Sequence, residues 1–285
     1  MRPATLPLRA NFGQALAWAA NPRHSHAMAD LEFAFRAEHL VATPAGALWW
    51  GTQRTLVVAD LHFEKGSAFA ARGVPLPPYD TAVTLDDLAR LIDRWRPQRV
   101  IALGDSFHDR RAGERITPAA VQRLRTLTAR VDWVWITGNH DPHPSGPWGG
   151  SVVECVSERG LTFCHEARGM AGEVSGHWHP KARVKVRGAL VTRRCFVLTP
   201  GQLILPAFGA LTGGLDVFDR ALSPLIGRGF EVLMCGRATV TRLPAERLSP
   251  RVEGEFDLDR RTGEPRVEGD ARPVDAEDLG QFRLW

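Results

Sequence analysis

The sequence is constrained most by a series of short apolar runs that each end in residues able to bind a metal ion. In the central run, residues 100–103 are followed by Gly104 and Asp105. Four apolar residues before a Gly and a carboxylate predict a buried strand that ends in a tight turn and presents Asp105 at its C-terminal end. Open α/β sheets carry their chemistry at this end of the strands. The run therefore predicts an α/β fold.

Other apolar runs end in the same way, and the residues at their ends are of metal-ligand type. They are Asp60 and His62 after residues 55–59, Asn139, His140 and Asp141 after residues 133–137, His165 after residues 161–164, and His177 and His179 after residues 173–175. Each ending alone is weak evidence, because a His after a strand is usually an ordinary histidine and a Gly-Asp pair is usually a turn. Such a series in one chain is very improbable by chance, and it predicts a metal centre.

At these residues, from about residue 55 to about residue 200, the sequence resembles the calcineurin-like metallophosphoesterases, whose signature is this series of blocks. Residues 59–67 (ADLHFEKGS) and 104–109 (GDSFHD) are also similar to one branch of that family, the ligase-associated DNA damage response endonucleases of the PdeM type. The resemblance implies a four-layer α/β/β/α sandwich of two mixed β-sheets flanked by helices. It also implies a role in DNA repair, with a DNA ligase, a helicase and an exonuclease as functional partners.

The resemblance further implies two divalent ions that share one ligand. One ion would be held by Asp60, His62, Asp105 and His179, and the other by Asp105, Asn139, His165 and His177. Carboxylate, imidazole and amide oxygen ligands suit Mn²⁺, Fe²⁺ or Zn²⁺, of which we expect Mn²⁺. No Cys lies in the blocks, which argues against a structural zinc site. Water between two such ions loses a proton near neutral pH, and the resulting hydroxide can attack phosphorus.

Three more residues are expected at the substrate. In the family, the residue at the position of His140 donates a proton to the leaving oxygen or a hydrogen bond to the transition state, and Asp141 is expected to orient its ring. His108 stands where the wider family commonly has Asp, although the PdeM-like branch has His there. His108 is interpreted either as a residue that contacts phosphate or tunes the site, or as an ordinary structural or surface histidine.

The charge of the chain favours a polyanionic partner. The 36 basic residues include 33 Arg, and residues 251–285 contain 6 Arg against 10 Asp and Glu. That segment is therefore −4, and because the chain is +4, residues 1–250 carry about +8. A basic body suits nucleic acid, although an Arg-rich proteome gives the same composition. Arg183, Lys185 and Arg187 alternate along a predicted strand, where they either track a nucleic-acid backbone or protect a sheet edge.

Helices are predicted over residues 80–96, with Asp80 and Thr81 as caps, and from Thr117-Pro118 onward. Both lie between metal-bearing strands, an alternation that brings the ligands together at one sheet edge. Residues 31–50 predict a pair of short strands. A second, mostly antiparallel sheet is predicted from four later segments, residues 182–186, 190–198, 201–205 and 231–241.

The location is expected to be cytoplasmic, without a membrane partner. The four cysteines are scattered, which fits a reducing compartment, and no apolar run approaches the roughly 20 residues of a membrane helix. We expect residues 1–29 to be a disordered extension, residues 30–248 to be the metallophosphoesterase domain and residues 249–285 to be a charged, flexible tail.

The function favoured by these observations is a Mn²⁺-dependent phosphodiesterase that cuts single-stranded DNA endonucleolytically. The metal chemistry follows from the residues, whereas DNA as the substrate follows mainly from the closer resemblance. Because the same ions serve monoesters and diesters, a phosphatase or a small-molecule (nucleotide) phosphodiesterase stays open. A non-catalytic scaffold is disfavoured, since every ligand position is occupied.

Overall fold

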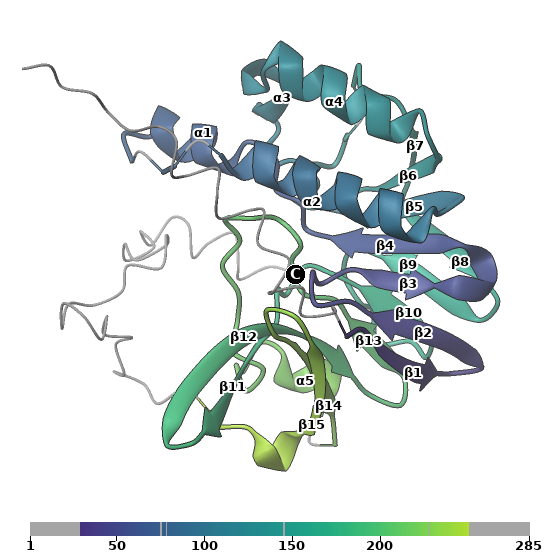
Figure 1. Cartoon of the computed structure of the whole chain (residues 1–285), viewed down its shortest axis with the longest axis vertical. Coiled ribbons are helices and arrows are strands. Elements are labelled where there is room, and N and C mark those ends of the chain that lie inside the picture. The colour runs from purple at the N-terminus through teal and green to yellow at the C-terminus, as the bar shows by residue number, and fades with distance from the viewer. Residues whose placement is uncertain (1–28, 75, 78, 145, 228, 251–285) are drawn as a thin grey trace, which may run out of the picture.

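The computed structural model describes residues 29–250 except residues 75, 78, 145 and 228. Two mixed β-sheets pack face to face and helices flank them, which confirms the predicted fold (Figure 1). The predicted N-terminal extension, apart from Ala29, and the predicted tail, apart from Ser249 and Pro250, lie outside the described residues. No helix of the described part is long and apolar enough to cross a membrane.

The first sheet has seven strands in chain order. They are β1 (Leu31–Phe35), β2 (Glu38–Ala42), β3 (Leu48–Trp50), β4 (Thr55–Ala59), β5 (Arg99–Leu103), β6 (Asp132–Ile136) and β7 (Ser151–Val153). Strands β1 to β4 pair antiparallel and strands β4 to β7 pair parallel. Ala59 is in register with Leu103, and Leu103 with Ile136, so the three central strands end at one level. The region of residues 31–50 thus holds three strands, not the predicted pair.

The helices on this side include α1 (Lys65–Ala71), α2 (Asp80–Trp95), α3 (Ala112–Arg115) and α4 (Pro118–Thr128). Leu85, Leu88 and Ile92 of α2 pack against the outer face of the first sheet. Residues at i, i+3 and i+7 share one face of a helix, which explains why these three are buried. The predicted cap of α4 is confirmed, because the Thr117 side chain accepts a hydrogen bond from the backbone amide of Ala120.

The predicted capping of α2 is wrong. The Asp80 carboxylate accepts a hydrogen bond from the Gly66 amide at 3.0 Å, and the Thr81 hydroxyl donates to Glu64 Oε1 at 3.0 Å. Neither side chain caps its own helix. Instead, both tie α1, which follows the Asp60 block directly, to the start of α2.

The second sheet has eight strands. They are β8 (Cys155–Glu158), β9 (Leu161–Cys164), β10 (Glu173–Ser175), β11 (Lys181–Val186), β12 (Ala189–Leu198), β13 (Gln202–Ile204), β14 (Glu231–Cys235) and β15 (Val240–Pro244). The order is β15-β14-β12-β13-β10-β9-β8, with β11 paired to β12. Residues 231–241 thus contain one strand and the start of another. The sheet also includes β8 to β10, which come before the segments predicted to form it.

Three apolar clusters hold these layers together. The largest lies between the sheets, the second lies under α2 and α4, and the third lies on the far side of the second sheet. The layer over that far side is thin, because the helices described there are α5 (Ser223–Ile226) and the 3₁₀ turn Ala245–Arg247. Figure 1 shows α1 to α4 on one side of the sheets and α5 on the other.

Candidate metal centre

The metal-ligand residues predicted from the sequence come together where the strands of the two sheets end. Strand β4 ends directly before Asp60, and β9 ends directly before His165. Strand β5 ends at Leu103, and Gly104 separates it from Asp105. The predicted alternation of strands and helices does bring the ligands after β4, β5 and β6 to one edge of the first sheet. The ligands after β9 and β10 come from the second sheet, so the centre lies between the ends of both sheets.

Two groups of ligand atoms are formed there, Asp60 with His62 and His179, and Asp105 with His165 and His177. Within each group the ligand atoms all lie within 4.8 Å of one another. In the first group, Asp60 Oδ1 lies 3.3 Å from His179 Nε2. In the second, Asp105 Oδ2 lies 3.4 Å from His165 Nε2. The members match the two ligand sets that the resemblance implies, with two differences. Asn139 is in neither group, and Asp105 belongs to the second group alone.

Asn139 joins the second group. Its Oδ1 atom lies 2.8 Å from His165 Nε2 and 3.1 Å from His177 Nδ1, and those two nitrogens lie 3.2 Å apart. In the first group, the Nε2 atoms of His62 and His179 lie 3.3 Å apart. Ring nitrogens and a carbonyl oxygen that converge this closely have the chemistry of a divalent-ion site. Each group would therefore hold one ion.

The two carboxylates are buried and held by backbone amides. Asp60 accepts hydrogen bonds from the His177 amide at 3.0 and 3.2 Å, and Asp105 Oδ1 accepts one from the His140 amide at 2.9 Å. Burial opposes ionisation of Asp105, but the hydrogen bond and charge of His165 outweigh it and hold the pKa of Asp105 below its usual range. Two charged oxygens are thus fixed in place, as a cation site requires.

His165 has its ring orientation fixed from outside the group. Its Nδ1 lies 3.0 Å from the Leu103 carbonyl oxygen, so the Nδ1 proton is donated there and Nε2 faces the centre. A metal-binding His commonly donates its second ring N–H in this way. Burial lowers the pKa of His165, but Asp105 and Asp60 overcome it and raise the pKa to about 9. Binding of an ion at Nε2 would therefore release a proton.

Two glycines of the sequence blocks are needed for close approach. A Cβ atom at Gly138 would lie 2.2 Å from both the backbone nitrogen and the Oδ1 of Asp105. A Cβ atom at Gly104, where φ is +67°, would lie 2.4 Å from His165 Nδ1. Any side chain at these positions would displace a ligand. Gly138 therefore lets the loops after β5 and β6 of the first sheet approach each other, and Gly104 lets His165 of the second sheet approach the first.

The backbone is also unusual at the ligands themselves. Asp60, His62, Asp105, His177 and His179 have φ between 42° and 70°. This left-handed region is uncommon for residues other than Gly, and it costs energy that the surrounding structure must offset. The chain turns sharply after β4, β5 and β10 and so directs side chains two positions apart, such as Asp60 and His62, to the centre. Periodicity in the sequence does not reveal this feature.

His140 lies at the open side of the centre. Its side chain is 42% exposed, and its Nδ1 lies 2.9 Å from the His108 carbonyl oxygen. Its Nε2 lies 3.9 Å from Asp105 Oδ2. We expected Asp141 to orient this ring. Instead, Asp141 Oδ2 accepts a hydrogen bond from the Phe107 amide at 2.9 Å, so Asp141 holds the loop after Asp105, and the His108 carbonyl contacts His140.

His108 is packed between two other imidazoles. It is buried, its Nδ1 lies 3.4 Å from His62 Nδ1, and its ring stacks on His140 with centroids 5.6 Å apart. Burial, followed by the charge of Lys65, lowers the pKa of His108 to about 3. A neutral His108 ring packs against the rings of His62 and His140 without adding a positive charge.

The chain is similar to one protein family and to several solved structures. Residues 53–185 match the model of the calcineurin-like phosphoesterase family. Among solved structures, the Pseudomonas putida nuclease MPE is 27% identical with a TM-score of 0.59, and the match covers 75% of this chain and 100% of that one. Yfce, a phosphoesterase from E. coli, is 13% identical with a TM-score of 0.34, covering 66% and 97%. No match was found among curated proteins.

Proposed function

We propose that this chain, which is a calcineurin-like metallophosphoesterase, is a nuclease that cuts phosphodiester bonds within single-stranded DNA with two Mn²⁺ ions. The observation that carries the proposal is the pair of ligand groups meeting between the two sheets with the exposed His140 beside them. Similarity to a nuclease over that protein's whole length supports nucleic acid as the substrate. Three oxygen ligands among seven fit Mn²⁺.

The residues of the centre have separate tasks in this proposal. Asp60, His62, Asp105 and His179 would hold one ion, and Asp105, Asn139, His165 and His177 the other. Bound divalent ions supply Lewis acidity, which activates water and neutralises charge on the phosphoryl oxygens. His140, held at Nδ1 by a carbonyl, would donate a proton from Nε2 to the leaving oxygen. Asp141 and His108 would position the loop and the ring.

The biological setting is part of the same proposal and is supported by the blocks at residues 59–67 and 104–109. Their similarity to the PdeM-type branch favours a cytoplasmic role in DNA repair together with a DNA ligase, a helicase and an exonuclease.

The proposal is tested with circular single-stranded DNA, p-nitrophenyl phosphate and bis(p-nitrophenyl) phosphate, each with Mn²⁺, Fe²⁺, Zn²⁺ or chelator. A circle has no ends, so its cleavage identifies an endonuclease. We expect the circle and the bis-ester to be cut with Mn²⁺, and the Asp105→Asn variant to be inactive because it loses a charged ligand. Hydrolysis of the monoester alone would identify a phosphatase and overturn the proposal.

A further inference from the structure

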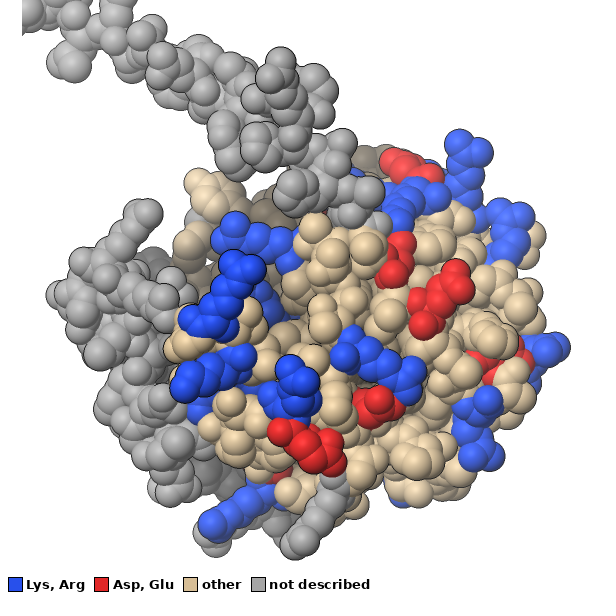
Figure 2. Space-filling view, turned by 60° about the horizontal axis from the view of Figure 1, so that its bottom comes forward, with Lys and Arg blue, Asp and Glu red and all other residues tan. Residues whose placement is uncertain are grey.

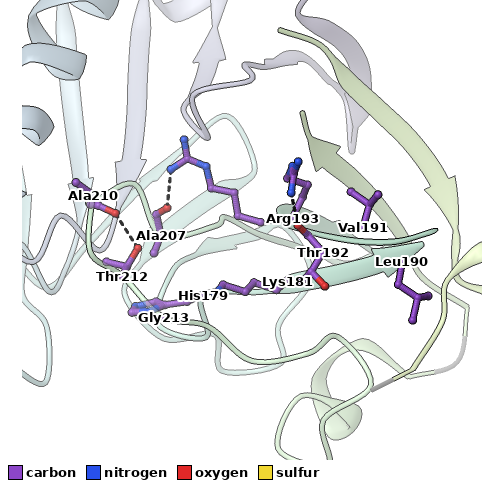
Figure 3. A pocket seen from close by; sticks show the side chains of 12 residues that line it. His179, Lys181, Leu190, Val191, Thr192, Arg193, Ala207, Ala210, Thr212 and Gly213 are labelled. Carbon is purple, nitrogen blue, oxygen red and sulfur yellow. Dashed lines mark hydrogen bonds between the residues drawn. The ribbon is translucent and has the colours of Figure 1, made fainter. Parts of the chain in front are cut away.

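A cavity of about 460 Å³ lies directly beside the metal centre. His179, a candidate ligand, forms part of its wall. From there the cavity runs between the β11–β12 hairpin and residues 207–213, which follow β13 (Figure 3). Binding pockets for small molecules have volumes of about 300 to 1,000 Å³, so this one has room for a group of nucleotide size. We call it the hairpin groove, lined among others by His179, Lys181, Thr192, Arg194, Ala210 and Gly213.

The hairpin side of the groove is basic. Lys181 of β11 lies opposite Arg194 of β12 in the strand register, and directly opposed residues on paired strands share a face. Ala182, the next residue of β11, is fully buried in the third apolar cluster, so Lys181 and Arg194 stand on the face away from that cluster. Arg193 also contributes to the lining. Three cationic residues therefore border the space next to His179.

Arg194 is held in place across the groove. Its Nη1 donates hydrogen bonds to the carbonyl oxygens of Ala207 at 3.2 Å and Phe208 at 3.4 Å. These carbonyls belong to the segment that forms the opposite wall. A guanidinium fixed in this way loses little freedom when it contacts an anion with its other N–H groups.

The opposite wall is made of small residues. Ala207, Gly209, Ala210 and Gly213 line it, and Thr212 folds its hydroxyl back onto the Gly209 carbonyl. A Cβ atom at Gly213 would meet no other atom within 4 Å. One wall of the groove is therefore cationic, and the other is made of small residues that leave space for a ligand. This combination suits a sugar-phosphate backbone better than an apolar ligand.

Positive charge continues beyond the groove. Lys185 and Arg187, at the far end of the hairpin, are exposed, as is Arg193. Figure 2 shows the molecule from its lower end, where the hairpin lies, and Lys and Arg side chains gather toward the left of this face. Arg183, predicted to lie in the same row, donates hydrogen bonds to the carbonyl oxygens of Ser249 and Pro250. Lys181 and Arg194 therefore supply positive charge inside the groove, and Lys185 and Arg187 supply it beyond the groove.

We infer that the hairpin groove binds the nucleotide next to the scissile phosphodiester, with Lys181 and Arg194 at the neighbouring phosphate. The inference rests on the proposed function, because a neighbouring nucleotide exists only when the substrate is a nucleic-acid strand. It gives the enzyme a means of preferring a polymer over a small diester. A small diester engages the ions alone, whereas a strand engages the ions and the groove together.

The first test obstructs the groove with Gly213→Leu. The matched control is Gly229→Leu, because Gly229 also has no neighbour within 4 Å of an added Cβ and does not line the groove. With a single-stranded oligonucleotide and Mn²⁺, we expect Gly213→Leu to lower kcat/KM about tenfold, mainly through KM. The Leu side chain would fill the groove and so prevent one charge-assisted contact between the strand and the hairpin. The control should match the wild type.

The second test removes charge with Lys181→Ala, and its control is Arg125→Ala on the exposed face of α4, at the other end of the molecule. Both variants lose one positive charge, so a general electrostatic effect would appear in both. We expect Lys181→Ala alone to lower the oligonucleotide kcat/KM about tenfold and to reduce the salt dependence of binding by about one phosphate contact.

Each variant is also assayed with bis(p-nitrophenyl) phosphate, and the ratio of the two activities corrects for folding and metal loading. A ratio that falls in both groove variants and stays constant in both controls supports the inference. A ratio that stays constant in the groove variants overturns it while leaving the nuclease proposal intact. Wild-type protein that hydrolyses the bis-ester but never the oligonucleotide overturns the nuclease proposal, and the inference with it.

Discussion

At the scale of single residues, His140 differs from the two carboxylate ligands beside it. Its side chain is exposed, whereas Asp60 and Asp105 are buried and fixed by backbone amides. Its Nδ1 contacts a carbonyl oxygen, which leaves Nε2 as the atom able to contact the substrate. A residue in this position can act on a leaving oxygen without holding an ion.

Replacing His140 by Ala should therefore separate catalysis from metal binding. We expect His140→Ala to keep its metal content, measured by elemental analysis, while kcat falls by roughly 10² or more, as is usual when a general acid is lost. Asn139→Ala, one residue earlier, is the control that should lose metal as well. Equal loss of metal and activity in His140→Ala would show that His140 is a ligand.

Gly138 allows a second test of the centre, because any added side chain would collide with the backbone of Asp105. An added Cβ atom would lie 2.2 Å from the backbone nitrogen of Asp105, so Gly138→Ala must displace the residue that both ions are expected to share. We expect Gly138→Ala to lose metal content and to lose activity by about 10² or more. Gly229→Ala, at an open position, should change neither. Full metal content in Gly138→Ala would contradict the packing described for Asp105.

At the scale of elements, the sequence predicts which segments are regular but not always what they pair with. Apolar runs and the Thr117-Pro118 cap are local patterns, and they correctly place β4, β5, β9 and α4. Asp80 and Thr81 also form a local capping pattern, yet their partners are Gly66 in α1 and Glu64 directly before α1. Pattern in one segment carries no information about such distant partners.

The same limit applies to the sheet that contains β9 and β10 and to the role expected for Asp141. An apolar run of four residues fits either sheet, so the sequence does not show that β9 and β10 lie in the second one. Asp141 is adjacent to His140 in the sequence, but its carboxylate faces Phe107. The ligand residue types were predictable because their chemistry is local. The left-handed backbone at five of them was not, because it depends on how the sheets meet.

Glu38 links strands of both sheets and gives a prediction with a defined pH dependence. It is 4% exposed at the start of β2, and it accepts hydrogen bonds from Trp50 Nε1 and Arg159 Nε, both at 2.8 Å. Trp50 is in β3, and Arg159 lies between β8 and β9. The hydrogen bond from Trp50, then that from Arg159, lowers the pKa of Glu38 below its ordinary 4.5.

Because the folded-state pKa is lowered, the stabilisation by Glu38 is fully present above pH 4.5 and is lost as the pH falls through the folded-state pKa. At pH 7 we expect Glu38→Gln to lower the free energy of unfolding by about 1 to 3 kcal/mol, as for hydrogen bonds to a charged group. In urea unfolding, this difference should shrink below pH 4.5. Glu246→Gln, on an exposed turn, is the control. A difference that does not change with pH would mean that charge is not the cause.

At the scale of the whole molecule, the metal centre joins the two sheets at their ends, while the apolar cluster between them joins their faces. Asp60 and Asp105 follow strands of the first sheet, and His165 follows a strand of the second. Ions bound by both sets of ligands would hold the sheets together. Binding to the folded state alone stabilises it, by about 2.7 kcal/mol for each site at a ligand concentration 100 times Kd.

Removal of the ions should therefore lower the stability of the entire fold. With Mn²⁺ added to chelator-treated protein, we expect Tm to rise by roughly 5 to 10 °C for each occupied site, given about 2 to 4 °C per kcal/mol for a domain of this size. His179→Ala removes one ligand of the first group and should lose part of the rise. His140→Ala should keep all of it, because the proposed role of His140 is proton donation and not metal binding. A full rise of Tm in His179→Ala would mean that His179 does not bind an ion. The first group of ligands would then be wrong.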